Sequence, residues 1–131
     1  VLTNVLGPAL LVKAALDELK SSRGRIIFIG STAGLTNTPG NVYSMTKWAV
    51  TGLAENTRLM VTGVGVGVTL IAPGRVETPF WEGRLQNVSD GAPAGASLSA
   101  EVVADTIAWV LGQPAGVDVN TIVIRPTSQV A

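Results

Sequence analysis

Two short apolar runs, set between helix-like segments, limit most strongly what this chain can fold into. Residues 26–30 have the sequence Ile-Ile-Phe-Ile-Gly, and residues 66–71 have the sequence Val-Gly-Val-Thr-Leu-Ile. The first run is apolar at consecutive positions, rather than at every second one, which is typical of a strand buried on both faces. Such strands belong to parallel sheets covered by helices on both sides. The second run is rich in strand-forming residues, although Gly67 weakens it.

Helical patterns separate these predicted strands. Residues 1–20 and 43–60 carry apolar residues at helical spacing, and a third helix should begin after Ser99, a suitable N-cap, and stop at Gly112. Residues 121–124 complete the pattern as a final strand. The alternation predicts an α/β fold, a doubly wound parallel sheet of the Rossmann-like type with right-handed crossovers.

Tyr43 and Lys47 lie four residues apart in the second helical pattern, so their side chains share one helix face. An ammonium beside a phenol favours the phenolate, which can act as a general base. The same pair could also belong to an ordinary half-exposed helix face. The surrounding residues favour the catalytic interpretation.

Two more polar residues are expected near this pair. Ser31 directly follows the first strand, and ligands of open parallel sheets bind beyond the carboxyl ends of the strands. Residues 32–42 have the composition of a loop. The helix that follows this loop is expected to bring Tyr43 and Lys47 back toward Ser31. Pro8 has no N–H, so the carbonyl of Asn4 loses its helical donor and could hold a water beside Lys47. Alternatively, Asn4 is a polar residue on the solvent side and Pro8 only shapes the helix.

In combination, these motifs resemble those of the short-chain dehydrogenase/reductase family, in order and with near-family spacing over essentially the whole chain. They comprise Asn4, Gly-Ser-Thr-Ala-Gly at residues 30–34, Tyr43-x-x-x-Lys47, and Ile-Ala-Pro-Gly-Arg-Val-Glu-Thr at residues 71–78. The tail at residues 120–129 resembles a branch containing serine and other hydroxy-acid dehydrogenases and clavulanate dehydrogenase.

The resemblance implies an oxidoreductase that transfers a hydride between a nicotinamide cofactor and a small alcohol or carbonyl substrate. Tyr43 would exchange the proton, Lys47 would bind the nicotinamide ribose, and Ser31 with Tyr43 would hydrogen-bond the substrate oxygen. Asn4 would anchor a water that links Lys47 to solvent. Each role suits a reaction in which charge develops on an oriented oxygen atom.

The resemblance also implies how the cofactor is held. NADP is the expected cofactor, with NAD not excluded, and the implied contacts are Tyr43, Lys47, Pro73, Gly74, Val76 and Thr78. Taken alone, Pro73 and Gly74 could form a plain turn. Phe80, Trp81 and residues 84–97 match the variable substrate loop of the family, and their composition fits a mobile lid.

Composition excludes several classes of function. Nine Lys plus Arg balance nine Asp plus Glu without runs of like charge, so neither nucleic acid nor a membrane surface is an expected partner. The chain contains no Cys and no His, which excludes disulfides and metal sites built on those residues. No apolar run approaches the roughly 18 residues of a membrane span, and a cytoplasmic location is the default expectation.

A Gly-rich phosphate-binding turn of the dinucleotide-binding type does not occur in the sequence. We therefore expect residues 1–131 to be the carboxyl-terminal half of a domain of roughly 240 residues. Alone, this half should be inactive. An inactive truncated or relic segment that serves in subunit association is the alternative. The helices at 1–20 and 43–60 are apolar on more than one face, so one face of each needs a partner. The family resemblance implies that the partner is a second copy, in a homodimer or homotetramer built through these two helices.

Overall fold

The computed structural model describes residues 1–79 and 97–130. The chain begins with a π-helical turn and then alternates helices with strands. In chain order these are the π-helical turn Leu2–Leu6, α1 (Gly7–Ser22), β1 (Arg25–Ile29), α2 (Val42–Val61), β2 (Gly67–Pro73), α3 (Ala100–Leu111) and β3 (Thr121–Ile124). The predicted helices and strands all form, with boundaries that differ by one or two residues except at the first helix.

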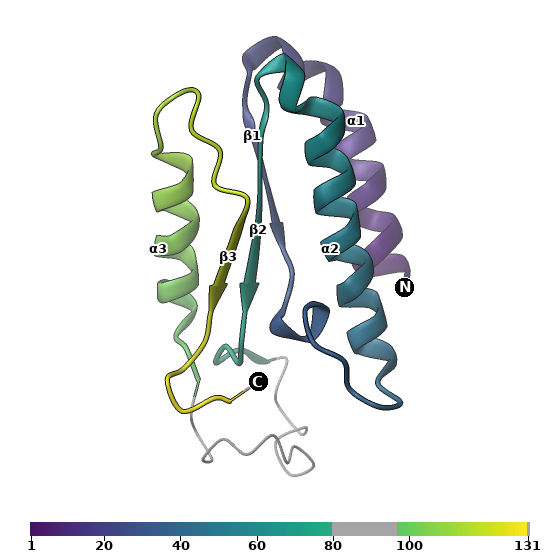
Figure 1. Cartoon of the computed structure of the whole chain (residues 1–131), viewed down its shortest axis with the longest axis vertical. Helices are drawn as coiled ribbons and strands as arrows, with labels where there is room; N and C mark the ends of the chain where they lie inside the picture. The colour runs from purple at the N-terminus through teal and green to yellow at the C-terminus, as the bar shows by residue number, and fades with distance from the viewer. Residues whose placement is uncertain (80–96, 131) are drawn as a thin grey trace.

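The three strands form one parallel sheet in the order β1-β2-β3. Figure 1 shows α1 and α2 against one face of this sheet and α3 against the other. The predicted parallel, Rossmann-like architecture with helices on both faces is therefore confirmed. All three strands point the same way, so their carboxyl ends meet at one edge of the sheet.

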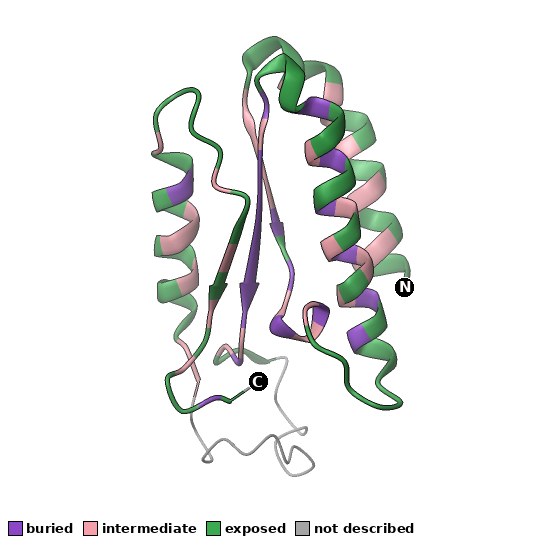
Figure 2. Ribbon diagram, in the orientation of Figure 1, coloured by how far each residue is buried: buried purple, intermediate pink, exposed green. Residues whose placement is uncertain are grey.

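The core lies between the sheet and the pair α1 and α2. It is built from Phe28 of β1, residues of β2, and the inward face of α2, with Val50, Ala54 and Val61 among its buried members. Figure 2 shows β2 as the strand that is buried along most of its length. Burial of apolar side chains is the main force that holds these layers together.

Burial on both faces was expected for β1, and it is β2 that is buried along most of its length. Phe28 is the only buried residue of β1, and Ile29 is 44% exposed. The reason is position: β2 has a neighbour on each side, whereas β1 pairs only with β2 in the part of the chain that the structure describes.

The first helix is α-helical only from Gly7 onward. The N–H of Gly7 donates to the carbonyl of Leu2, five residues earlier, which is the spacing of a π-helix. Pro8 follows and supplies no N–H. The irregular turn therefore coincides with the Gly-Pro pair at which the sequence predicts a disturbed helix.

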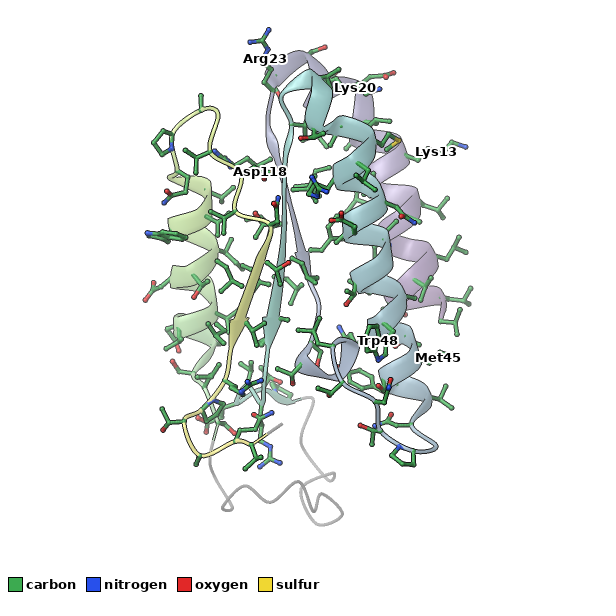
Figure 3. The ribbon with its side chains drawn as sticks, in the orientation of Figure 1. Lys13, Lys20, Arg23, Met45, Trp48 and Asp118 are labelled. Carbon is green, nitrogen blue, oxygen red and sulfur yellow. The ribbon has the colours of Figure 1, made fainter. Side chains whose placement is uncertain are left out.

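Side chains continue the ladder between β2 and the segment before β3. Asp118, labelled in Figure 3, accepts a hydrogen bond from the N–H of Val68 at 2.9 Å. Arg25, at the start of β1, donates to the carbonyls of Gln113, Pro114 and Val117 at 2.8 to 3.1 Å. These contacts join the end of α3 to the sheet.

The packing of α2 against the turn after β1 depends on Gly34. A Cβ atom at this position would collide with the carbonyl of Lys47 and lie 2.9 Å from Oγ1 of Thr51. Both obstacles belong to α2, and one of them is backbone. The absence of a side chain at Gly34 therefore sets how closely α2 approaches the sheet edge.

We expect Gly34→Ala to lower the free energy of unfolding by about 1 to 3 kcal/mol, because the added methyl group forces α2 outward. The matched control is Gly63→Ala. A Cβ at Gly63 meets nothing within 4 Å, so alanine there should be neutral or stabilising by about 0.4 to 1 kcal/mol. Urea denaturation measures both variants, and equal effects would contradict this account of Gly34.

Candidate active site

The candidate site residues gather where the strands end. Ser31 follows β1, Tyr43 and Lys47 lie in the first two turns of α2, and residues 73–78 begin at the end of β2. Figure 1 shows the turn after β1, the start of α2 and the segment after β2 at the same edge of the sheet. This is the edge at which parallel sheets bind ligands.

Ser31 holds its own turn in place. Its Oγ accepts a hydrogen bond from the N–H of Ala33 at 3.1 Å and so caps the short 3-10 turn Thr32–Gly34. A hydroxyl has one proton and two lone pairs, so this bond occupies an acceptor position and leaves the proton able to donate. Ser31 is thus suited to donate to an oxygen atom of a ligand.

Tyr43 and Lys47 lie on the same face of α2, as their spacing predicts. Asn41 caps the helix by accepting from the N–H of Ser44 at 3.1 Å, which fixes where the first turn begins. Nζ of Lys47 lies 5.7 Å from the centre of the Tyr43 ring. Partial burial lowers the pKa of the Lys47 ammonium. A cation that is partly desolvated acts more strongly on its neighbours than one in bulk water.

Hydroxyl groups of α2 fix this pair relative to Ser31. Ser44 Oγ donates to the carbonyl of Ala33 at 2.6 Å, and Thr51 Oγ1 donates to the carbonyl of Gly34 at 3.0 Å. Trp48, which Figure 3 shows pointing from α2 toward the loop, donates from Nε1 to the carbonyl of Thr36 at 3.2 Å. These bonds hold the turn after β1 against the first three turns of α2.

The sequence analysis missed Ser44 and Thr51. The available signal was their spacing of seven residues, which places two hydroxyl groups on one helix face. Backbone carbonyls of a turn are the partners, however, and a sequence pattern does not show where those carbonyls point.

Asn4 is tied to α2. Its Nδ2 donates to Oγ1 of Thr46 at 3.1 Å, and Thr46 Oγ1 donates its own proton to the carbonyl of Tyr43 at 2.7 Å. Because that proton is committed, Oγ1 can only accept from Asn4, which fixes the orientation of the Asn4 amide. The solvent-side alternative for the Asn4 side chain therefore does not hold.

Asn4 and Lys47 are also two of the few polar residues that line a cavity of about 680 Å³. The other lining residues are mostly apolar side chains of α1 and β1. The cavity therefore follows β1 and not the strand ends, and we do not assign it to the substrate.

The segment after β2 is held as an extended strand-like piece and not as a plain turn. Pro73 is the last residue of β2, and the N–H of Gly74 donates to the carbonyl of Ile124 at 2.7 Å. Val76 then forms a parallel bridge with Leu98. Thr78 is exposed at the end of the segment. A hydrogen bond to Ile124 and a bridge to Leu98 therefore hold the backbone of this segment.

The expected substrate loop, with Phe80, Trp81 and residues 84–97, lies outside the described residues except for Ser97. Across residues 1–79 and 97–130, no cluster of acidic side chains is arranged to hold a metal ion. No helix within these two ranges is both long and apolar enough to cross a membrane.

The side chains present suit the nicotinamide end of a dinucleotide. A hydroxyl, a phenol and an ammonium, from Ser31, Tyr43 and Lys47, offer donors to ribose hydroxyls and to a substrate oxygen. The supported backbone at residues 74–78 offers N–H and C=O groups, which suit a carboxamide. The donor set therefore fits the cofactor that the sequence predicts.

Known proteins share these features. A family model described as short chain dehydrogenase matches residues 1–89, more than half of the chain. An uncharacterised oxidoreductase of Staphylococcus epidermidis is 36% identical over 125 residues, which cover 94% of this chain and 52% of that protein. The serine 3-dehydrogenase of Agrobacterium fabrum is 32% identical over 132 residues, which cover 97% of this chain and 53% of that enzyme.

A solved structure of serine dehydrogenase, in a closed form complexed with NADP⁺, matches with a TM-score of 0.85 and 35% identity, covering 98% of this chain and 55% of that structure. The chain spans about half the length of each of these relatives. The predicted relationship to serine and hydroxy-acid dehydrogenases is confirmed by these similarities. Motifs, fold and relatives agree, and the chain belongs to the short-chain dehydrogenase family.

Proposed function

We propose that this chain forms the catalytic half of an NAD(P)-dependent oxidoreductase that acts on the CH–OH group of a small molecule. The observation that carries the proposal is the position of the Lys47 ammonium, 5.7 Å from the centre of the Tyr43 ring at the edge where the strands end. A phenol beside a partly desolvated cation, at the same edge of the sheet as the Ser31 hydroxyl, is suited to exchange a proton with a reacting oxygen.

In this proposal Tyr43 gives its proton to the substrate oxygen in reduction and takes it back in oxidation. Lys47 stabilises the phenolate form of Tyr43 and binds the ribose of the cofactor. Ser31 donates its hydroxyl proton to the same substrate oxygen. Asn4, fixed to α2 through Thr46, is suited to hold a water through which Lys47 exchanges protons with solvent. A bound nicotinamide supplies or accepts the hydride.

NADP is the proposed cofactor, and NAD is not excluded. Its support is the serine dehydrogenase relative with NADP⁺ bound, which shares the fold at 35% identity. Pro73, Gly74, Val76 and Thr78 are proposed to hold the nicotinamide carboxamide, together with Tyr43 and Lys47 at the ribose. The serine dehydrogenase relatives favour a small hydroxy acid as substrate.

We also propose that residues 1–131 are one half of a longer domain. The relatives are about twice as long as this chain. The part of each relative that this chain does not match is long enough to form a phosphate-binding half of the domain. The alternative, an inactive segment that serves only in association, would need no proton-exchanging pair.

Tyr43→Phe should reduce turnover of the full-length protein by about 10² or more, because only the acidic hydroxyl is lost. Lys47→Met should lower turnover and also weaken cofactor binding. Steady-state kinetics and the cofactor Kd measure these effects, and circular dichroism checks folding. Near-normal turnover of the Phe variant would mean that Tyr43 is not the acid.

The segment of 131 residues alone should bind NADPH and NADH with a Kd in the millimolar range or weaker. It offers no Gly-rich turn with a helix N-terminus for the pyrophosphate, and losing several kcal/mol moves a micromolar Kd at least into that range. Fluorescence titration of the purified segment measures the Kd. Saturable micromolar binding would contradict the proposal that a second half completes the cofactor site.

A homodimer or homotetramer through α1 and α2 is the proposed assembly, in a cytoplasmic protein. Both helices carry exposed apolar side chains, among them Leu10 and Leu11 of α1 and Met45, Leu59 and Met60 of α2. Figure 3 shows Met45 pointing outward from α2. Apolar surface shared by two neighbouring helices is typical of an interface between subunits.

Leu10→Glu should therefore dissociate the full-length protein, because it places a charge within the proposed interface. Trp109→Glu is the matched control, since Trp109 is an equally exposed apolar residue on α3, across the sheet. Light scattering at micromolar concentration measures the mass of each variant. A wild-type monomer, or the same effect from both substitutions, would exclude this interface.

A further inference from the structure

The tail after β3 returns to the end of β2. In Figure 1 the last described part of this tail lies near the tip of that strand. Gln129 is only 9% exposed, although Thr127 and Ser128 before it and Val130 after it are exposed. The N–H of Gln129 donates to the carbonyl of Pro126 at 2.9 Å, so the tail turns at this point. The turn directs the Gln129 side chain inward.

The buried amide of Gln129 meets the backbone of the segment after β2. Its Oε1 accepts a hydrogen bond from the N–H of Arg75 at 2.8 Å, across 54 positions of sequence. Gly74 leaves the space for this contact: a Cβ there would collide with Oε1 of Gln129 and lie 2.7 Å from Cβ of Arg125. Gly74 therefore has to be glycine because the tail packs against it.

A second contact holds the same segment further along. The carbonyl of Arg75 accepts from the N–H of Leu98, and the N–H of Glu77 donates to the carbonyl of Leu98, both at 2.8 Å. In an extended backbone, successive residues direct their N–H and C=O groups to opposite sides. The N–H and C=O of Val76, between these two anchors, therefore point away from Leu98. Those are the groups that a carboxamide can use.

We propose that Gln129 is a positioning residue for the nicotinamide. It anchors the start of the Arg75–Thr78 segment and so sets where the backbone of Val76 meets the carboxamide of the cofactor. The inference rests on the proposed function. It gives a role to the tail at residues 120–129, for which the sequence shows only a resemblance to one branch of the family.

The type of residue at position 129 supports this role. An apolar side chain of similar size would fill the same space but leave the N–H of Arg75 without this acceptor. A buried primary amide is unfavourable unless it is hydrogen-bonded. Here the amide oxygen has a backbone partner in the very segment whose position matters.

The test compares two ligands on the full-length protein. NADPH reaches the nicotinamide end of the site, whereas 2′,5′-ADP contains only the adenosine end. Gln129→Met keeps the length of the side chain and removes the acceptor. We expect it to raise the Kd of NADPH by about tenfold and to leave the Kd of 2′,5′-ADP within about twofold of wild type. Calorimetric titration measures both constants.

Gln113→Met is the matched control, because Gln113 lies after α3 and bonds to the carbonyl of Trp109. It should leave both constants unchanged. Gln129→Glu, which keeps an acceptor oxygen, should retain most of the NADPH affinity. Gln129→Ser admits water to the N–H of Arg75, so it should weaken NADPH binding by less than the Met variant does and leave 2′,5′-ADP binding unchanged. This variant provides the test if the Met variant does not fold.

Equal weakening of both ligands would show a general loosening of the fold and would overturn the positioning role. Unchanged NADPH binding in the Met and Ser variants would overturn it as well. If wild-type protein binds neither NADPH nor NADH, the proposed function itself fails, independently of Gln129.

Discussion

The close approach of α2 to the turn after β1 is the constraint on which the candidate site depends. Gly34 allows it, since a methyl group there would meet the carbonyl of Lys47. Ser44 and Thr51 then hydrogen-bond to the carbonyls of Ala33 and Gly34. A hydroxyl at a strand end and a phenol with an ammonium on a helix can act on one atom only if their separation is fixed.

On both sides of the site, a side chain of one element hydrogen-bonds to the backbone of another. On one side, hydroxyls of α2 bind the carbonyls of the turn after β1. On the other side, the amide of Gln129 binds the N–H of Arg75 at the end of β2. In each case a glycine, Gly34 or Gly74, removes the atoms that would prevent the approach. The parallel strands bring the site residues to one edge of the sheet, and these hydrogen bonds fix how closely the neighbouring segments approach.

Much of the fold could be predicted, because hydrophobic periodicity and turn residues act locally. The limits of β3 and the cap at Ser99 agree with the sequence analysis. The burial expected for β1 was wrong, since burial depends on how many strands lie alongside and not on the strand's own residues. The same-face relation of Tyr43 and Lys47 was predictable because it follows from helix geometry alone.

The sequence by itself determined the elements, their order and the types of chemical group at the strand ends, since each depends on near neighbours in the chain. Only the tertiary structure decided that Asn4 binds Thr46 and that Gln129 reaches Arg75. Those partners are 42 and 54 positions apart. Contacts of that kind depend on the packing of whole helices and strands, and a local pattern carries no record of which backbone groups the packing brings within reach.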